Sequence, residues 1–220
     1  MKVFVINGSP RKKGNTATVL NHAVSGIAMA GGEAELVHLA DYRFSGCKSC
    51  FACKLIGGKS HGHCATSDDL TPLLQRLHGE AGGLILGAPV YFSTVSALLA
   101  AFNERFFFPY LTCNMERPSS FPRSIPSACI CTMNVTKEQA AHYHYDITLG
   151  PPLRFMRSIL GREPLALNVY NTYQYSDYNK FDSSVFSEPD KARWRDEHFP
   201  RDCKRSFELG ARVAEDALKA

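Results

Sequence analysis

The sequence predicts an α/β protein whose parallel sheet is covered by helices on both faces. Short apolar runs alternate five times with segments of helical periodicity, and this order is typical of a parallel sheet. The apolar runs are continuous, as strands buried on both faces require. A length of 220 residues suits one large domain, or one domain with an added terminal segment.

The first half of the chain contains three of the expected strands. Apolar runs that end at turn residues predict strands over Val3–Ile6, Ala34–Leu39 and Gly83–Ala88. Apolar residues at helical spacing predict helices over Thr16–Met29, Leu70–Leu77 and Ser96–Phe108. The segment from residue 41 to residue 67 contains four cysteines and is expected to be a long loop.

The second half repeats the pattern less regularly. Residues 111–127 are rich in Pro and Ser and are expected to form an irregular surface segment. Strands are predicted over Ala128–Met133 and Leu165–Val169. A helix is expected over Thr136–Asp146, with an interruption at Gly150–Pro152 and a resumption over Leu153–Leu160. Residues 187–220 are expected to be helical, with a cap at Ser187 and a break at Pro200.

The composition excludes several classes of protein. Hydrophobic residues make up 45% and charged residues 21%, which is ordinary for a globular chain. The formal net charge is only +4 and the basic residues are scattered, so we expect neither nucleic-acid nor membrane binding. No uncharged apolar stretch approaches the ~20 residues that span a bilayer, and we see no signal peptide. We therefore expect a cytoplasmic protein with reduced thiols.

A polar loop with two glycines joins the first strand to the first helix. Gly8–Thr16 reads GSPRKKGNT. Free N–H groups at the start of a helix suit a phosphate, and Ser9, Arg11, Asn15 and Thr16 could add donors. The spacing matches neither the P-loop nor the dinucleotide fingerprint, which favours a single phosphate monoester. The alternative is an ordinary loop with a threonine cap.

Together with Gly87–Phe92 (GAPVYF), this loop resembles the flavodoxin-like NAD(P)H-dependent FMN reductases, and most closely their iron–sulfur flavoprotein branch. The resemblance covers residues 1–108 well and the order of elements to about residue 170. It implies a flavodoxin-like three-layer α/β/α fold with a five-stranded parallel sheet of order 2-1-3-4-5. We expect residues 1–175 to form the FMN-binding domain. Residues 176–220 would be a helical extension, packed on that domain or on a neighbouring subunit.

The resemblance also implies where FMN would lie. The phosphate would lie in the first loop, at Ser9, Arg11, Gly14, Asn15 and Thr16. The flavin ring would lie against the loop after the third strand, at Pro89, Val90, Tyr91, Phe92 and Ser93. The segment after the fourth strand would approach the ring from the other side, at Thr132, Met133 and Asn134. The alternative for Tyr91 and Phe92 is a role in the core or in an interface.

Four cysteines follow the second strand, at positions 47, 50, 53 and 64. Cys47, Cys50, Cys53 and Cys64 have a spacing that could hold a [4Fe–4S] cluster. The resemblance implies a shorter interval before the fourth cysteine than the ten residues found here. Zinc bound by these cysteines, with His61 or His63 in place of Cys64, is a second interpretation. Reduced thiols without a metal are a third.

The sequence therefore predicts an FMN-dependent oxidoreductase. Hydride would pass from NADH or NADPH to FMN, and electrons would pass on to a quinone, a nitro compound, an iron centre or a carrier protein. No acid or base is assigned, because hydride transfer requires none. The alternatives are an FMN and iron–sulfur electron carrier without NAD(P)H activity, and a non-enzymatic zinc or redox sensor that uses Cys47–Cys64. We expect a homodimer or homotetramer.

Overall fold

A computed structural model describes residues 2–114 and 116–219. Five parallel strands form the central sheet in the order β2-β1-β3-β5-β6. A two-residue strand, β4, pairs antiparallel with the end of β3. The strands are β1 (Lys2–Asn7), β2 (Glu33–His38), β3 (Ala81–Tyr91), β4 (Thr94–Val95), β5 (Ser127–Thr132) and β6 (Leu165–Val169). Counted along the chain, the five parallel strands have the order 2-1-3-4-5, so the predicted fold is confirmed.

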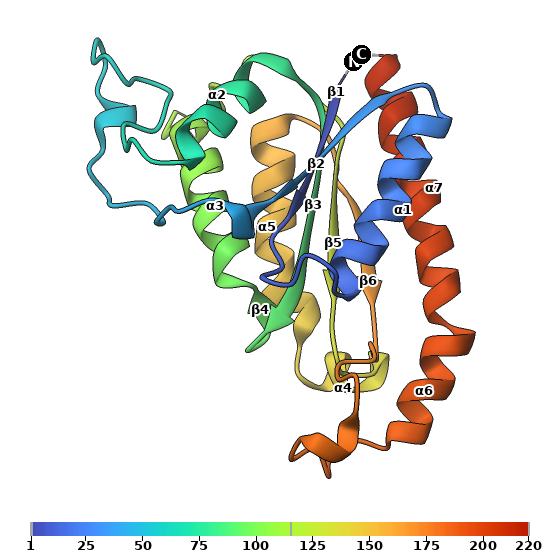
Figure 1. Cartoon of the computed structure of the whole chain (residues 1–220). Helices are drawn as coiled ribbons and strands as arrows, with labels where there is room; N and C mark the ends of the chain where they lie inside the picture. The colour runs from blue at the N-terminus through green and yellow to red at the C-terminus, as the bar shows by residue number, and fades with distance from the viewer. Residues whose placement is uncertain (1, 115, 220) are drawn as a thin grey trace.

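Helices cover both faces of this sheet (Figure 1). The helices are α1 (Asn15–Met29), α2 (Leu70–Glu80), α3 (Ala97–Phe107), α4 (Lys137–His142), α5 (Tyr145–Leu160), α6 (Glu188–Glu197) and α7 (Phe199–Leu218). Leucines of α2 and phenylalanines of α3 form one apolar core together with α5. The apolar faces of α1 and α7 form a second core on the opposite face. The two cores bury the sheet on both sides, which explains its continuous apolar strands.

Helices α1 and α7 approach each other closely through two glycines. A Cβ atom on Gly26 would lie 1.9 Å from the carbonyl oxygen of Phe207, and one on Gly210 would lie 2.1 Å from that of Ala23. Only glycine leaves room for backbones this close. The last helix thus packs within this chain against the first helix. The division of the chain at residue 175 stays a prediction.

Two local predictions are wrong. The segment after residue 88 was expected to be a loop, but β3 continues to Tyr91 and turns back through β4. Phe92 and Ser93 form this turn with φ angles of 49° and 63°, and neither is a residue that usually marks such a turn. The helix interruption expected at Gly150–Pro152 also does not occur, because α5 runs through both prolines. The break falls instead at His144, whose φ is 54°.

The predicted end of the chain agrees with the structure. Helix α6 ends at Glu197 and α7 begins at Phe199, so the break falls beside Pro200. The hydroxyl of Ser187 accepts a hydrogen bond from the backbone N–H of Asp190 and caps α6. None of the described helices is both long and apolar enough to cross a membrane.

Candidate functional site

The carboxyl ends of β1, β3, β5 and β6 meet at one edge of the sheet, and a cavity of about 290 Å³ lies there. Ligands of open α/β sheets bind at this edge. The cavity is lined by residues of all three segments that the sequence predicted, and by two further residues: Ser9, Arg11, Asn15, Thr16, Pro89, Val90, Tyr91, Phe92, Thr132, Met133, Asn134, Thr172 and Gln174. Of the predicted residues, only Gly14 and Ser93 are not in its lining.

A chain of short hydrogen bonds shapes the first loop. The buried Asn7 accepts from the backbone N–H of Ser9 at 2.9 Å, and the Ser9 hydroxyl accepts from that of Arg11 at 3.1 Å. The loop also touches β3, because the N–H of Gly8 donates to the carbonyl of Gly87 at 2.7 Å. A Cβ atom on Gly8 would lie 2.6 Å from the Cβ of Leu99 in α3. These bonds hold the loop close against the sheet edge.

Helix α1 begins at this loop without a cap. Its N-cap residue is Gly14, and no side chain of the described residues accepts a hydrogen bond from its first turn. No acidic residue lies in that turn. The first N–H groups of a helix need acceptors, and an anion can supply them. The start of α1 therefore presents free N–H groups to the cavity edge.

Helix α1 and strand β5 are joined inside the cavity. The hydroxyls of Thr16 and Thr132 lie 2.7 Å apart, and both residues are buried. The loop after β5 is joined to the segment after β6, since the N–H of Thr172 donates to the carbonyl of Met133 at 3.0 Å. Thr132 lies beside Pro89 in the parallel pairing of β5 with β3, and Met133 and Asn134 follow it in the lining of the cavity.

Residues 172–174 form a wall of the cavity that sequence reasoning missed. The side chain of Asn15 donates to the carbonyl of Tyr173 at 2.9 Å, and Arg11 donates to that of Gln174 at 3.2 Å. The side-chain oxygen of Gln174 is buried and has no hydrogen-bond partner among the described residues. The only signal for this wall was position, since these residues follow a strand whose end lies at the same edge.

A buried lysine supports the loop after β5. Lys191 of α6 is only 5% exposed, and its ammonium donates to both oxygens of Asn134. Burial lowers the pKa of Lys191 to about 8. Among residues 2–114 and 116–219, no carboxylate forms an ion pair with this ammonium. A positive charge without a counterion thus lies directly behind a cavity residue.

The four predicted cysteine ligands differ in burial. Cys50 is exposed, Cys53 is buried, and Cys47 and Cys64 are half-buried. The Cys64 sulfur accepts a hydrogen bond from the guanidinium of Arg105 at 2.8 Å. In the part of the chain that is described, no three Cys, His, Asp or Glu side chains are grouped so as to hold a metal. In the described structure these side chains therefore do not form a ready metal-binding group.

A buried ion pair fixes the end of the cysteine segment instead. The Arg105 guanidinium, 1% exposed, donates to both carboxylate oxygens of Asp68, at 2.7 and 3.1 Å. It also donates to the carbonyls of Ser45 and Thr66. Hydrogen bonding to Arg105 lowers the pKa of Asp68 below its usual value of 3.8. Arg105 thereby fastens both ends of the segment to α3.

The sheet order, the uncapped helix and the cavity at the strand ends define a protein of the flavodoxin-like class. The sequence model of the NADPH-dependent FMN reductases matches residues 1–121. The chain belongs to this family, which confirms the resemblance seen in its motifs.

Curated relatives agree with the branch that the motifs indicated. An iron–sulfur flavoprotein of Methanocaldococcus jannaschii is 42% identical over 105 residues, covering 48% of this chain and 51% of the relative. An iron–sulfur flavoprotein of Archaeoglobus fulgidus is 35% identical over 105 residues, covering 48% of each chain. The chain spans about half the length of the curated relatives it matches.

Solved structures with the same fold cover almost the whole chain. An NAD(P)H:quinone oxidoreductase from Methanothermobacter marburgensis has a TM-score of 0.66 at 15% identity and covers 97% of this chain and 96% of its own. An FMN-dependent NADH-azoreductase from Bacillus anthracis, in complex with FMN, has a TM-score of 0.66 at 12% identity. The match covers 97% of this chain and 99% of the azoreductase chain. At these identities the likeness supports the fold.

Proposed function

We propose that this protein is an FMN-dependent oxidoreductase that uses NADH or NADPH to reduce a second acceptor. The acceptor would be a quinone, a nitro compound, an iron centre or a carrier protein. The observation that supports this proposal most is the cavity at the strand ends, which is lined by the uncapped start of α1 and by Gln174, whose buried oxygen has no partner among the described residues. Family membership supports the choice of FMN.

The residues of the cavity fit this cofactor. The start of α1, with Ser9, Arg11, Asn15 and Thr16, would bind the phosphate. The free oxygen of Gln174 would accept a hydrogen bond from a ring N–H group. Tyr91 and Phe92 project at the rim with large exposed fractions, and they would cover a flat ring. FMN, when bound, supplies a ring that accepts hydride from a nicotinamide and passes electrons on.

The chain's own part is to bind and orient the reactants. Backbone N–H groups of the hairpin after β3 would stabilise negative charge on the ring. The unpaired ammonium of Lys191 would add a positive field behind Asn134. The hydrogen bond between Thr16 and Thr132 would hold the phosphate end and the ring end of the cavity in fixed relation.

Oxidation of NADH and NADPH by the purified full chain tests this function. With FMN and a quinone present, we expect steady loss of reduced nicotinamide, and this loss should require both. Arg11→Ala should need more FMN for the same rate, whereas Lys13→Ala should not, because Lys13 does not line the cavity. Full occupancy by FMN without any nicotinamide oxidation would contradict the proposal.

A second candidate is an electron carrier with FMN and a [4Fe–4S] cluster. The names of the curated relatives and the spacing of Cys47, Cys50 and Cys53 favour it. An anaerobic preparation should be assayed for iron, acid-labile sulfide and released flavin. Roughly four irons per chain would support this candidate, and flavin without iron would exclude it.

We also propose that the chain assembles with copies of itself. Large apolar side chains are exposed at three places, with Ile56 in the cysteine segment, Phe92 in the hairpin and Phe155 on α5. Exposed apolar groups of this size are typical of interfaces. Light scattering during size-exclusion chromatography should give a mass of two or four chains, and a single-chain mass would contradict this.

A further inference from the structure

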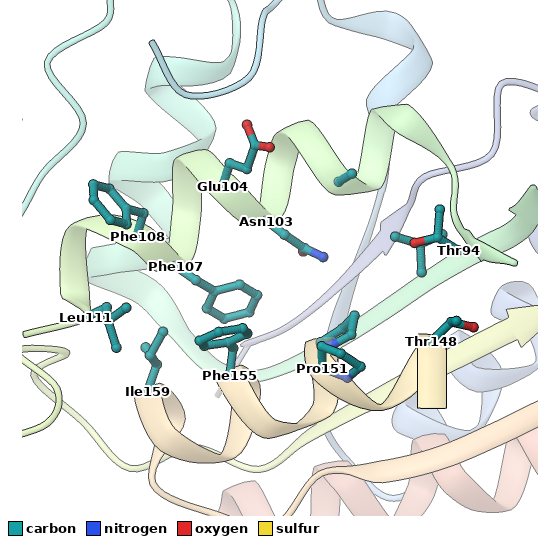
Figure 2. A pocket seen from close by; sticks show the side chains of 13 residues that line it. Thr94, Asn103, Glu104, Phe107, Phe108, Leu111, Thr148, Pro151, Phe155 and Ile159 are labelled. Carbon is teal, nitrogen blue, oxygen red and sulfur yellow. The ribbon is translucent and has the colours of Figure 1, made fainter. Parts of the chain in front are cut away.

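A second and larger cavity, of about 480 Å³, lies between α3 and α5 (Figure 2). Its volume is in the range of small-molecule sites. Its walls are mainly apolar, with Phe107 and Phe108 on one side and Pro151 and Phe155 on the other. It shares a wall with the cofactor cavity, because Thr94 and Val95 of β4 line this cavity, whereas Tyr91 and Phe92 of the same hairpin line the other.

The cavity contains a polar group without a partner. Figure 2 shows the side chain of Asn103 directed from α3 into the space between the helices. Its oxygen is buried and makes no hydrogen bond to any described residue. Buried acceptors in folded proteins are nearly always satisfied, so an orphan that lines a cavity indicates a missing donor.

Helix α5 supplies a second acceptor nearby. Pro151 and Pro152 have no N–H to donate to the carbonyls four residues earlier, at Ile147 and Thr148. Thr148 itself lines the cavity. The buried Asn103 oxygen and the carbonyls left by the two prolines are acceptors. A ligand that matches them must bring hydrogen-bond donors on an apolar body.

We propose that this cavity binds a flat aromatic compound that carries a hydroxyl or amino donor, with the donor bonded to Asn103. The ring would pack between Phe107 and Phe155, and the hairpin would separate it from the cofactor cavity. Reduction of a quinone or a nitroaromatic produces compounds of this kind. That link to the reaction rests on the proposed function, but the binding itself does not.

Calorimetric titration of the full chain, saturated with FMN, tests the proposal with two matched probes. 2-Naphthol carries the donor, and 2-methoxynaphthalene has the same rings without it. We expect 2-naphthol to bind about tenfold more tightly than its ether, because the ether leaves the Asn103 oxygen unpaired. Repeating the titration without FMN should give the same ratio, which separates this site from the cofactor cavity.

Two variants locate the binding. Asn103→Leu should abolish the preference for 2-naphthol, whereas Asn21→Leu, on α1 in the opposite layer, should keep it. Ala100→Leu, which places bulk inside the cavity, should weaken both probes while circular dichroism stays unchanged. Equal affinity of the two probes for the unaltered chain would overturn the proposal. The proposal would also be overturned if neither probe bound to the unaltered chain and that chain proved to be a dimer that Phe155→Asp converts to a monomer. A second copy of the chain would then occupy the cavity.

Discussion

The side-chain nitrogen of Lys191 lies 2.5 Å from the main-chain oxygen of Asn134, a residue that lines the candidate cofactor cavity. This contact joins α6 to the loop after β5. The charged groups nearest along α6 are engaged elsewhere, since Glu188 accepts from Tyr173 and Asp190 pairs with Arg193. An anion in the cavity would be the natural counterion of this buried ammonium.

Lys191→Met should weaken the binding of FMN about fivefold, because a charge interaction of about 1 kcal/mol is lost. Burial lowers the pKa of Lys191 to about 8 in the free protein, and a bound anion favours its charged form. The affinity of the unaltered chain should therefore be highest below pH 8 and fall as the pH rises above it. Fluorescence titrations from acidic to alkaline pH measure this, with the exposed Lys204→Met as control. An unchanged pH profile in Lys191→Met would be inconsistent with this role.

Arg11→Ala should weaken FMN binding about tenfold and leave riboflavin binding nearly unchanged. The guanidinium lines the cavity beside the uncapped start of α1, and a charge-assisted hydrogen bond contributes about 1.5–3 kcal/mol. Flavin retained after dialysis gives a direct readout. Equal loss of FMN and riboflavin affinity would place Arg11 away from the phosphate.

Arg105→Met should destabilise the fold by about 3 kcal/mol, because it leaves the Asp68 carboxylate without its buried partner. Urea unfolding measures the change. Arg157→Met is a matched control, since it removes an ion pair of similar length whose two side chains are about 70% exposed. That control should cost less than about 0.5 kcal/mol.

The same ion pair predicts an acid dependence of stability. Arg105 lowers the pKa of Asp68 in the folded chain below 3.8, so the stabilising contribution is complete above that pH. It should be lost as the pH falls below 3.8 through the folded-state pKa. The free energy of unfolding of the unaltered chain should fall more steeply in this range than that of Arg105→Met. Parallel curves would contradict the assignment.

Gly26→Ala should destabilise the protein by about 1–3 kcal/mol, since the new Cβ would overlap the carbonyl of Phe207 and separate α1 from α7. Gly79→Ala is the control, because nothing lies within 4 Å of a Cβ there. In a helix this second change should stabilise by about 0.5–1 kcal/mol. Thermal unfolding measures both. A neutral Gly26→Ala would show that α7 does not pack tightly on α1.

Much of the fold was predictable because local patterns and topology agree. Continuous apolar strands and alternating helices predicted the layers, and the ends of parallel strands had to meet at one edge. That edge brings Ser9, Pro89 and Thr132 together although they lie far apart in the sequence. The loops after β1, β3 and β5 could therefore be placed from motifs and order alone.

The remaining parts carry no local signature. The turn at Phe92 and Ser93 has neither Asn nor Gly, so a hairpin was not expected. The wall at residues 172–174 depends on hydrogen bonds of Tyr173 and Gln174 to residues more than 150 positions away. The cysteine spacing left a cluster, zinc and free thiols open, and the Arg105 network that binds Cys64 is tertiary and could not be read from spacing.

Titration of the flavin-free full chain with FMN and with riboflavin tests the central claim most directly. These ligands differ only in the phosphate, which the start of α1 and Arg11 would bind. We predict that FMN binds at least about 100-fold more tightly, as two charge-assisted hydrogen bonds would give. Equal affinities, or no binding of FMN, would contradict the assignment of this cavity.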